Sequence, residues 1–196
     1  RDLRFHFPIK PISEDSWLSK TGLIWAKMKK PFLGVAPLSI APSRTWNSEK
    51  FVALSKSFVE KTSGTVFLLG SQSEYDVIEK MAQQVGQGAV NTAGKLLWSD
   101  LGWVMSQLNF FVGNDSGLMH VAGCFKIPGV IVFGASEPKW ALPPFSSLKP
   151  IQNREIFCVP CLKNHCIRKG QNYNECLNSI SVEDIQINIP TQPIDI

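Results

Sequence analysis

Short apolar runs recur along the middle of this sequence, and each is followed by a segment with helical periodicity. The runs occupy residues 32–36, 65–69, 110–112 and 130–133. Apolar runs of this length, without polar alternation, are typical of strands that are covered on both faces. Strands that alternate with helices form parallel sheets with right-handed crossovers. We therefore predict an α/β fold, a Rossmann-like doubly wound parallel sheet.

The segments between these runs carry apolar residues at the spacing of amphipathic helices. Helices are expected after a cap at Asn47 or Ser48, over residues 74–85, over residues 101–108 with Ser99 as the cap, from Ser116, and from Ser181. A further short strand is expected at residues 89–91. Near the start, residues 13–16 resemble a helix cap, which predicts a short helix that continues through Met28.

Composition excludes several classes of protein. A hydrophobic content of 44% with 18% charged residues is that of a globular chain. No apolar run approaches the roughly 18 residues of a membrane span, and the start lacks a signal-peptide pattern, so we expect a cytoplasmic protein. The net charge of +4 suits a phosphorylated substrate or an anionic membrane surface. Because the basic residues are scattered, nucleic-acid binding is not indicated.

The run at residues 110–112 leads into an Asp-Ser-Gly turn and then a helical segment. In an open parallel sheet, ligands bind beyond the carboxyl ends of the strands, where the N–H groups of a helix N-terminus attract phosphate. Ser116 offers a hydroxyl, and Gly117 lets a ligand approach the backbone. His120, one turn further on, lies on the same face. We predict a nucleotide-phosphate site here; the alternative is that Asp115 is an ordinary cap and His120 a structural residue.

Other polar residues follow the neighbouring strands. Ser39 and Arg44 come after the first, Glu74 after the second and Ser136 after the last. Arg44 is suited to neutralise a diphosphate, and Glu74 to accept hydrogen bonds from ribose hydroxyls. Alternatively, Arg44 is a solvated charge and Glu74 a first-turn helix residue placed for the dipole. Trp46 and Trp140 lie beside these loops, where an adenine or a partner domain can stack, although packing is the favoured role.

Four cysteines cluster near the C-terminus, at Cys158, Cys161, Cys166 and Cys176. The first two have the Cys-x2-Cys spacing of a zinc site, so a structural zinc is a candidate. Reduced thiols and disulfides are the alternatives. Cys124 is expected to be a buried small hydrophobe. Bulky aromatic residues are expected in the core, namely Trp98, Trp103, Phe110, Phe111 and Phe133.

Taken together, several of these motifs are similar to one known family. The segments concerned are residues 44–51, 67–70, 113–122, 128, 133–134 and 158–161. They resemble the C-terminal half of the heptosyltransferases, glycosyltransferases that add heptose from ADP-heptose to the inner core of lipopolysaccharide. The similarity covers about residues 30–188 in the same order, and the block at residues 115–120 is its most specific part.

The resemblance implies one half of a GT-B enzyme, whose two Rossmann-like domains enclose the active site. Residues 31–196 would then be the nucleotide-sugar-binding domain, with a Cys-rich tail at 151–180, and residues 1–30 a connecting segment from a missing N-terminal domain. In the family, that missing domain carries the acceptor site and the proposed general base. Asn47 stands where the family usually has Pro, which affects the start of a helix.

Site residues follow from the resemblance by position. Arg44 matches the family's basic residue on the diphosphate, and Glu74 a carboxylate near the adenosine ribose, although Gln72 competes for that alignment. The loop around the donor's phosphates and sugar is matched by Asp115, Ser116, Gly117 and His120, with Ser39 on the neighbouring loop.

The chemistry implied is an inverting displacement at the anomeric carbon, with ADP as the leaving group and without a cofactor or an obligatory metal. Arg44, Asp115 and His120 are the candidate catalytic residues: Arg44 stabilises charge on the diphosphate, and His120 supports that charge or holds Asp115. The implied partners are ADP-heptose or another nucleotide sugar, the lipopolysaccharide core acceptor, and the inner-membrane surface as a peripheral site. The alternatives are a GT-B-shaped sugar-nucleotide epimerase and a non-catalytic, zinc-stapled binding module.

Overall fold

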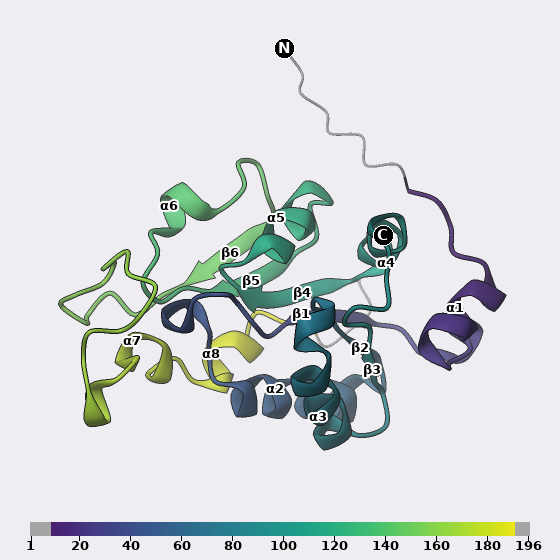
Figure 1. The fold of residues 1–196 in the computed structure, drawn as a ribbon, viewed down its shortest axis with the longest axis horizontal. Coiled ribbons are helices and arrows are strands. Elements are labelled where there is room, and N and C mark those ends of the chain that lie inside the picture. Colours follow the sequence, from purple (N-terminus) through teal and green to yellow (C-terminus); the bar gives the residue numbers. More distant parts are fainter. Residues whose placement is uncertain (1–8, 191–196) are drawn as a thin grey trace, which may run out of the picture.

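The computed structural model describes residues 9–190, which form a six-stranded, fully parallel sheet with helices on both faces (Figure 1). The strands are β1 (Phe32–Ala36), β2 (Thr65–Leu68), β3 (Ala89–Asn91), β4 (Phe110–Asn114), β5 (Gly129–Val132) and β6 (Leu148–Ile151). Their order is β3-β2-β1-β4-β5-β6, that of doubly wound nucleotide-binding sheets. The predicted fold class is therefore confirmed.

Two layers of helices cover the sheet (Figure 1). The helices are α1 (Glu14–Thr21), α2 (Ser48–Thr62), α3 (Tyr75–Val85), α4 (Trp98–Gln107), α5 (Gly117–Cys124), α6 (Pro138–Ala141), α7 (Glu175–Asn178) and α8 (Val182–Gln186). Short 3-10 turns occupy Trp25–Lys27, Pro42–Arg44, Gln72–Glu74 and Gly170–Asn172. Buried residues of α2, α3, α7 and α8 pack on one face of the sheet, and those of α1, α4 and α5 on the other.

Each central strand serves both layers. In β1, Leu33 and Val35 belong to one hydrophobic core, whereas Phe32 and Ala36 belong to the other. All four side chains are buried, so the strand shows no polar alternation in its sequence. At Gly34, an added Cβ would overlap the Leu108 side chain, so this glycine makes room for the residue that follows α4 to pack against the sheet.

The boundaries of the helices follow local hydrogen bonds. The Asn47 side chain accepts the Glu49 N–H (2.7 Å), which confirms the predicted cap of α2. Ser181 caps α8 by accepting the Asp184 N–H (3.1 Å), and the Asp184 carboxylate accepts the Ser181 N–H in return. The Ser181 N–H and hydroxyl both donate to the Asp184 carboxylate and hold its pKa below its usual value.

The predicted helix near the N-terminus is shorter than expected. Ser13 caps it, but it ends at Thr21 because Gly22 adopts a left-handed conformation (φ 74°) that terminates the helix. The chain then makes only the turn Trp25–Lys27. Trp17 is fully buried and packs edge-on against Trp25 (ring centroids 4.9 Å apart), so this segment contributes to the core.

Three expectations of burial were wrong, namely those for Trp98, Cys124 and Trp140. Trp98 is 70% exposed because it occupies the first position of α4, whose buried residues begin at Asp100; Leu97, and not Ser99, precedes the helix as its cap. Cys124 is exposed because Met119 and Ala122 turn toward the core and residue 124 lies on another face of α5. The packing interpretation of the two tryptophans beside the loops is confirmed for Trp46, which is fully buried, and wrong for Trp140, which is 75% exposed.

Strand β6 was not predicted from the sequence. It is an edge strand that pairs only with β5 within the described residues, and it contains Pro150. Proline is tolerated at sheet edges because no neighbour needs its missing N–H. Lys149 and Pro150 are exposed, so the strand lacks the continuous apolar pattern of the others.

A buried amide links the carboxyl ends of β1 and β4. Asn114, with 0% exposure, donates to the Pro37 carbonyl (2.7 Å) and accepts the Trp46 N–H (2.9 Å). Both partners belong to the segment between β1 and α2, so one side chain fixes the path of that whole loop. Such buried polar groups are costly to leave unpaired.

We predict that Asn114→Ala lowers the free energy of unfolding by about 2–4 kcal/mol, because it orphans a buried N–H and a buried carbonyl. The measurement is urea denaturation followed by circular dichroism. Asn188→Ala is the matched control: its amide donates to the Asp184 carbonyl at an exposed position (3.0 Å). A loss for Asn114→Ala no larger than that of the control would contradict the role given to this amide.

Candidate functional site

The candidate site lies at the carboxyl edge of the sheet, where three loops meet. Asp115 directly follows β4, and its carboxylate Oδ2 lies 3.4 Å from Arg44 Nη1, in the turn after β1. The hydroxyl of Ser136, from the loop after β5, donates to the same Oδ2. Ser39 donates to the Asp115 carbonyl (3.0 Å). The structure thus brings together Ser39, Arg44, Asp115 and Ser136, all of which the sequence placed in loops after the strands.

The electrostatics of this cluster depend on burial. Asp115 is 6% exposed, and a buried carboxylate requires a charged or hydrogen-bonded partner. Arg44 and Ser136 provide these partners. Arg44 is also held by Asn164, whose Oδ1 accepts from Nη2 (3.3 Å), yet its side chain keeps 33% of its surface exposed. The guanidinium is therefore oriented from two sides and still open to a ligand.

The N-terminus of α5 lies beside this cluster. Ser116 precedes the helix in an extended conformation and makes no side-chain capping hydrogen bond within the described residues. An added Cβ at Gly117 would meet nothing there within 4 Å. The surface around Gly117, at this helix end, is therefore open, and the free N–H groups of a helix N-terminus attract anions. The Ser116 hydroxyl is buried and has no described hydrogen-bond partner, so a phosphate would reach the backbone before this hydroxyl.

His120 is on the same helix but makes no contact with the cluster. It is exposed, and no hydrogen bond or ion pair joins it to Asp115 in the part of the chain that the structure describes. The carboxylate of Asp115 is oriented by Arg44 and Ser136 instead. A charge-supporting role for His120 stays a prediction.

Glu74 lies apart from the other candidates, after β2. Its carboxylate accepts both the N–H and the hydroxyl of Ser71 (2.7 Å each), a capping box at the start of Gln72–Glu74. This is the structural alternative considered for Glu74 from its sequence position. The predicted contact with a ribose stays a prediction.

Sequence reasoning missed part of the site. A cavity of about 200 Å³ at this edge is lined by Arg44, Ala135, Ser136, Leu162, Lys163 and Asn164. The last three residues belong to the Cys-rich segment. The available signal was a Lys-Asn pair between Cys161 and Cys166, in a segment that we interpreted only in terms of its thiols.

The four clustered cysteines lie next to this cavity. Cys158, Cys161, Cys166 and Cys176 line one small cavity, which also borders Ser43 and Ala135, and all four are free thiols. Within residues 9–190, no group of three or more His, Cys, Asp or Glu side chains has the geometry to hold a metal ion. Burial, and then the neighbouring Cys158, Cys166 and Cys161, raise the pKa of the Cys176 thiol.

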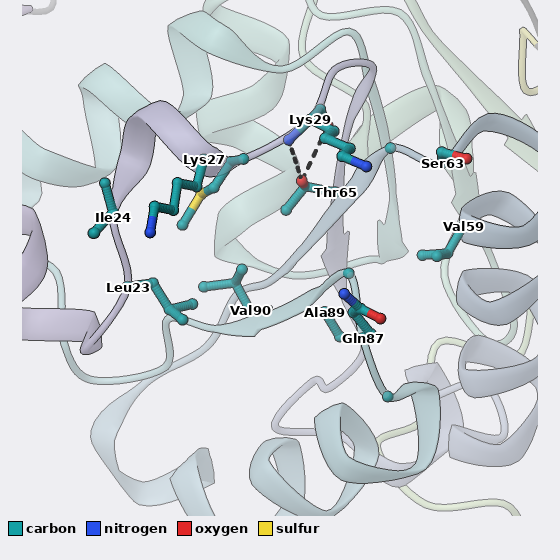
Figure 2. Close-up of a pocket in the computed structure, with 14 residues that line it drawn as sticks. Leu23, Ile24, Lys27, Lys29, Val59, Ser63, Thr65, Gln87, Ala89 and Val90 are labelled. Atoms are coloured by element: carbon teal, nitrogen blue, oxygen red, sulfur yellow. Dashed lines mark hydrogen bonds between the residues drawn. The ribbon is translucent and has the colours of Figure 1, made fainter.

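Another cavity, larger than the one beside Arg44, lies at the opposite edge of the sheet (Figure 2). Its volume is about 540 Å³. Lys27, Lys29 and Val90 are among its lining residues. The Thr65 hydroxyl accepts the Lys29 N–H (3.1 Å) and donates to the Lys29 carbonyl (3.0 Å). Because this cavity adjoins the amino ends of β2 and β3, it is separate from the site around Asp115.

The parallel sheet and its strand order define a doubly wound α/β domain, a class of fold in which ligands bind at the carboxyl edge of the sheet. The chain belongs to glycosyltransferase family 9 (heptosyltransferase), whose family model matches residues 7–172. In the described residues, no helix is long and apolar enough to cross a membrane.

Individual relatives agree with this assignment. The chain is 22% identical over 199 residues to lipooligosaccharide heptosyltransferase 2 of Campylobacter jejuni, with 94% of this chain and 56% of that protein covered. It is 26% identical over 165 residues to lipopolysaccharide heptosyltransferase 2 of Salmonella typhimurium, with 80% of this chain and 45% of that protein covered. The chain thus spans about half the length of the curated relatives it matches.

Its fold matches the solved structure of E. coli ADP-heptose lipopolysaccharide heptosyltransferase II. The TM-score is 0.68 at 21% identity, and the match covers 96% of this chain and 54% of the other.

The thiols give a prediction about reactivity. Cys124 is exposed, whereas Cys176 is half-buried with a raised pKa, so its thiolate fraction at pH 8 is reduced. With iodoacetamide at pH 8, we expect Cys124 to be alkylated first and Cys176 last, as followed by peptide mass spectrometry. Equal rates in the native protein would contradict the described burial. Alkylation in urea is the control, because unfolding removes the difference.

Proposed function

We propose that this chain is the sugar-donor-binding half of an inverting glycosyltransferase that transfers heptose from ADP-heptose to the inner core of lipopolysaccharide. Membership of the heptosyltransferase family supports the reaction class. The names of the relatives and of the E. coli structure support heptose as the sugar and ADP as its carrier.

One observation carries the assignment of the donor site: an oriented arginine beside an open helix N-terminus. Arg44 is bonded to Asp115, and Asp115 is only two residues before the first residue of α5. The guanidinium is therefore bonded to a residue that lies next to the N-terminus of α5 in the sequence. The guanidinium and the helix N-terminus both favour anions, and a diphosphate is large enough to contact the two together.

In the proposed reaction, an acceptor hydroxyl attacks the anomeric carbon of heptose as the bond from that carbon to the diphosphate oxygen breaks. The electron pair of that bond leaves with ADP. Arg44 and the N–H groups of α5 stabilise the charge that grows on the diphosphate, and Asp115 keeps Arg44 in place before the reaction begins. His120 supports the same charge. The general base that takes the acceptor proton is proposed to lie in the other half of the protein.

The location that this function requires is the cytoplasmic face of the inner membrane, where a lipid-linked acceptor presents its core sugars. The net charge of +4 supports peripheral attraction to an anionic surface.

The test is calorimetric titration of the 196-residue chain with ADP, and with UDP as the nucleotide control, with and without Mg²⁺. We expect metal-independent binding that favours ADP. Arg44→Met should weaken ADP binding about tenfold, because a charge-assisted contact with the diphosphate is lost. Arg154→Met is the matched control, since Arg154 is exposed and pairs with Glu137 away from this site (2.6 Å).

Equal affinities for ADP and UDP, or an Arg44→Met variant that binds like Arg154→Met, would contradict the assignment of the donor site.

A further inference from the structure

The cavity next to Arg44 has a wall that comes from the Cys-rich segment. Residues 162–164 line this cavity opposite Arg44 and Ser136, although they are separated from Arg44 by more than one hundred positions in the sequence. This wall, which we call the 162–164 loop, belongs to no helix or strand. It lies at the carboxyl edge, beside the cluster around Asp115.

The 162–164 loop is fixed to the domain by hydrogen bonds to two other loops. The Leu162 N–H donates to the Ala135 carbonyl (2.8 Å) after β5. Ser43 donates twice, through its N–H to the Asn164 carbonyl (3.3 Å) and through its hydroxyl to the Lys163 carbonyl. Ser43 is itself buried. These backbone contacts hold the loop in position without a ligand.

The charges around the cavity are unbalanced in a way that suits a polyanion. The positive charge of Arg44 is largely compensated by Asp115. Lys163 is exposed and lines the cavity, and no acidic side chain in residues 9–190 lies within ion-pair distance of it. A nucleoside diphosphate carries more than one negative charge, so Arg44 with its paired aspartate does not neutralise it alone.

We propose that Lys163 is a further binding residue for the diphosphate of the sugar donor, and that Asn164 is a positioning residue that orients Arg44 toward it. This proposal rests on the proposed function. Asn164 Oδ1 accepts from Arg44 Nη2 on the side away from the Nη1 contact with Asp115. The cavity therefore presents one oriented guanidinium and one unpaired ammonium to the same ligand.

The experiment compares Lys163→Met with Lys169→Met by calorimetric titration with ADP and with adenosine. Lys169 lies in the same Cys-rich segment, is also exposed, and does not line this cavity, so both variants remove one positive charge from that segment. We expect Lys163→Met to weaken ADP binding about three- to tenfold and to leave adenosine binding unchanged, because adenosine lacks the diphosphate. Lys169→Met should bind both like the wild type.

Added salt provides a second readout. The difference between the wild type and Lys163→Met should shrink as NaCl rises from 50 to 500 mM, because screening weakens an exposed contact between charges. Asn164→Ala should weaken ADP binding in the wild type but have no further effect in Arg44→Met, since it acts through that arginine.

The outcomes separate this inference from the proposed function. Equal losses of ADP affinity in Lys163→Met and Lys169→Met would indicate that only the overall positive charge of the segment matters. No loss of ADP affinity in either variant would leave Lys163 without a role. Each result overturns the inference while ADP binding by the wild type stands. A weakened affinity of Lys163→Met for adenosine would also overturn it, because the effect would then not involve the diphosphate. Absence of ADP binding by the wild type would overturn the proposed function first.

Discussion

The amide of Asn114 is the interaction on which the carboxyl edge of this domain depends. It sits at the end of a central strand, fully buried, and bonds both the carbonyl of Pro37 and the N–H of Trp46. A side chain with one donor group and one acceptor group thus satisfies two backbone groups of the loop after β1. Because these two groups bracket the loop that carries Ser39 and Arg44, the position of the arginine follows from this buried bridge.

Asp115, the residue after Asn114, is likewise a buried polar residue that bonds to other loops. Asp115 is buried where a lone carboxylate would be unstable, and it is stabilised by Arg44 and Ser136 from two other loops. The arginine is consequently oriented before any ligand arrives, with part of its surface still exposed. Preorganised charge of this kind avoids the cost of reorganisation during a reaction.

Much of the fold could be predicted because β1, β2, β4 and β5 are buried on both faces and therefore have continuous apolar sequences. Caps such as Asn47 and Ser181 could be predicted because their hydrogen bonds are local. The edge strand β6 could not, since Lys149 and Pro150 face solvent and its existence depends on its neighbour.

The candidate site also contains residues that could be predicted from the sequence and residues that could not. Ser39, Arg44 and Asp115 follow strands of a parallel sheet, so topology alone predicts that they meet. Glu74 carries a readable capping pattern with Ser71, and that local bond is what it makes. Lys163 and Asn164 reach the site through contacts that span more than one hundred residues, within a segment of irregular backbone; no periodic pattern encodes such contacts.

The 162–164 loop lines the cavity beside Arg44 but lies apart from the residues that keep this domain folded. None of the three loop residues belongs to either hydrophobic core. Its attachment uses mostly backbone groups, so side chains at positions 163 and 164 can change without altering the attachment of the loop. A domain arranged in this way can diverge in ligand preference while its sheet stays constant, which makes this short loop a natural place for relatives of one fold to become different enzymes.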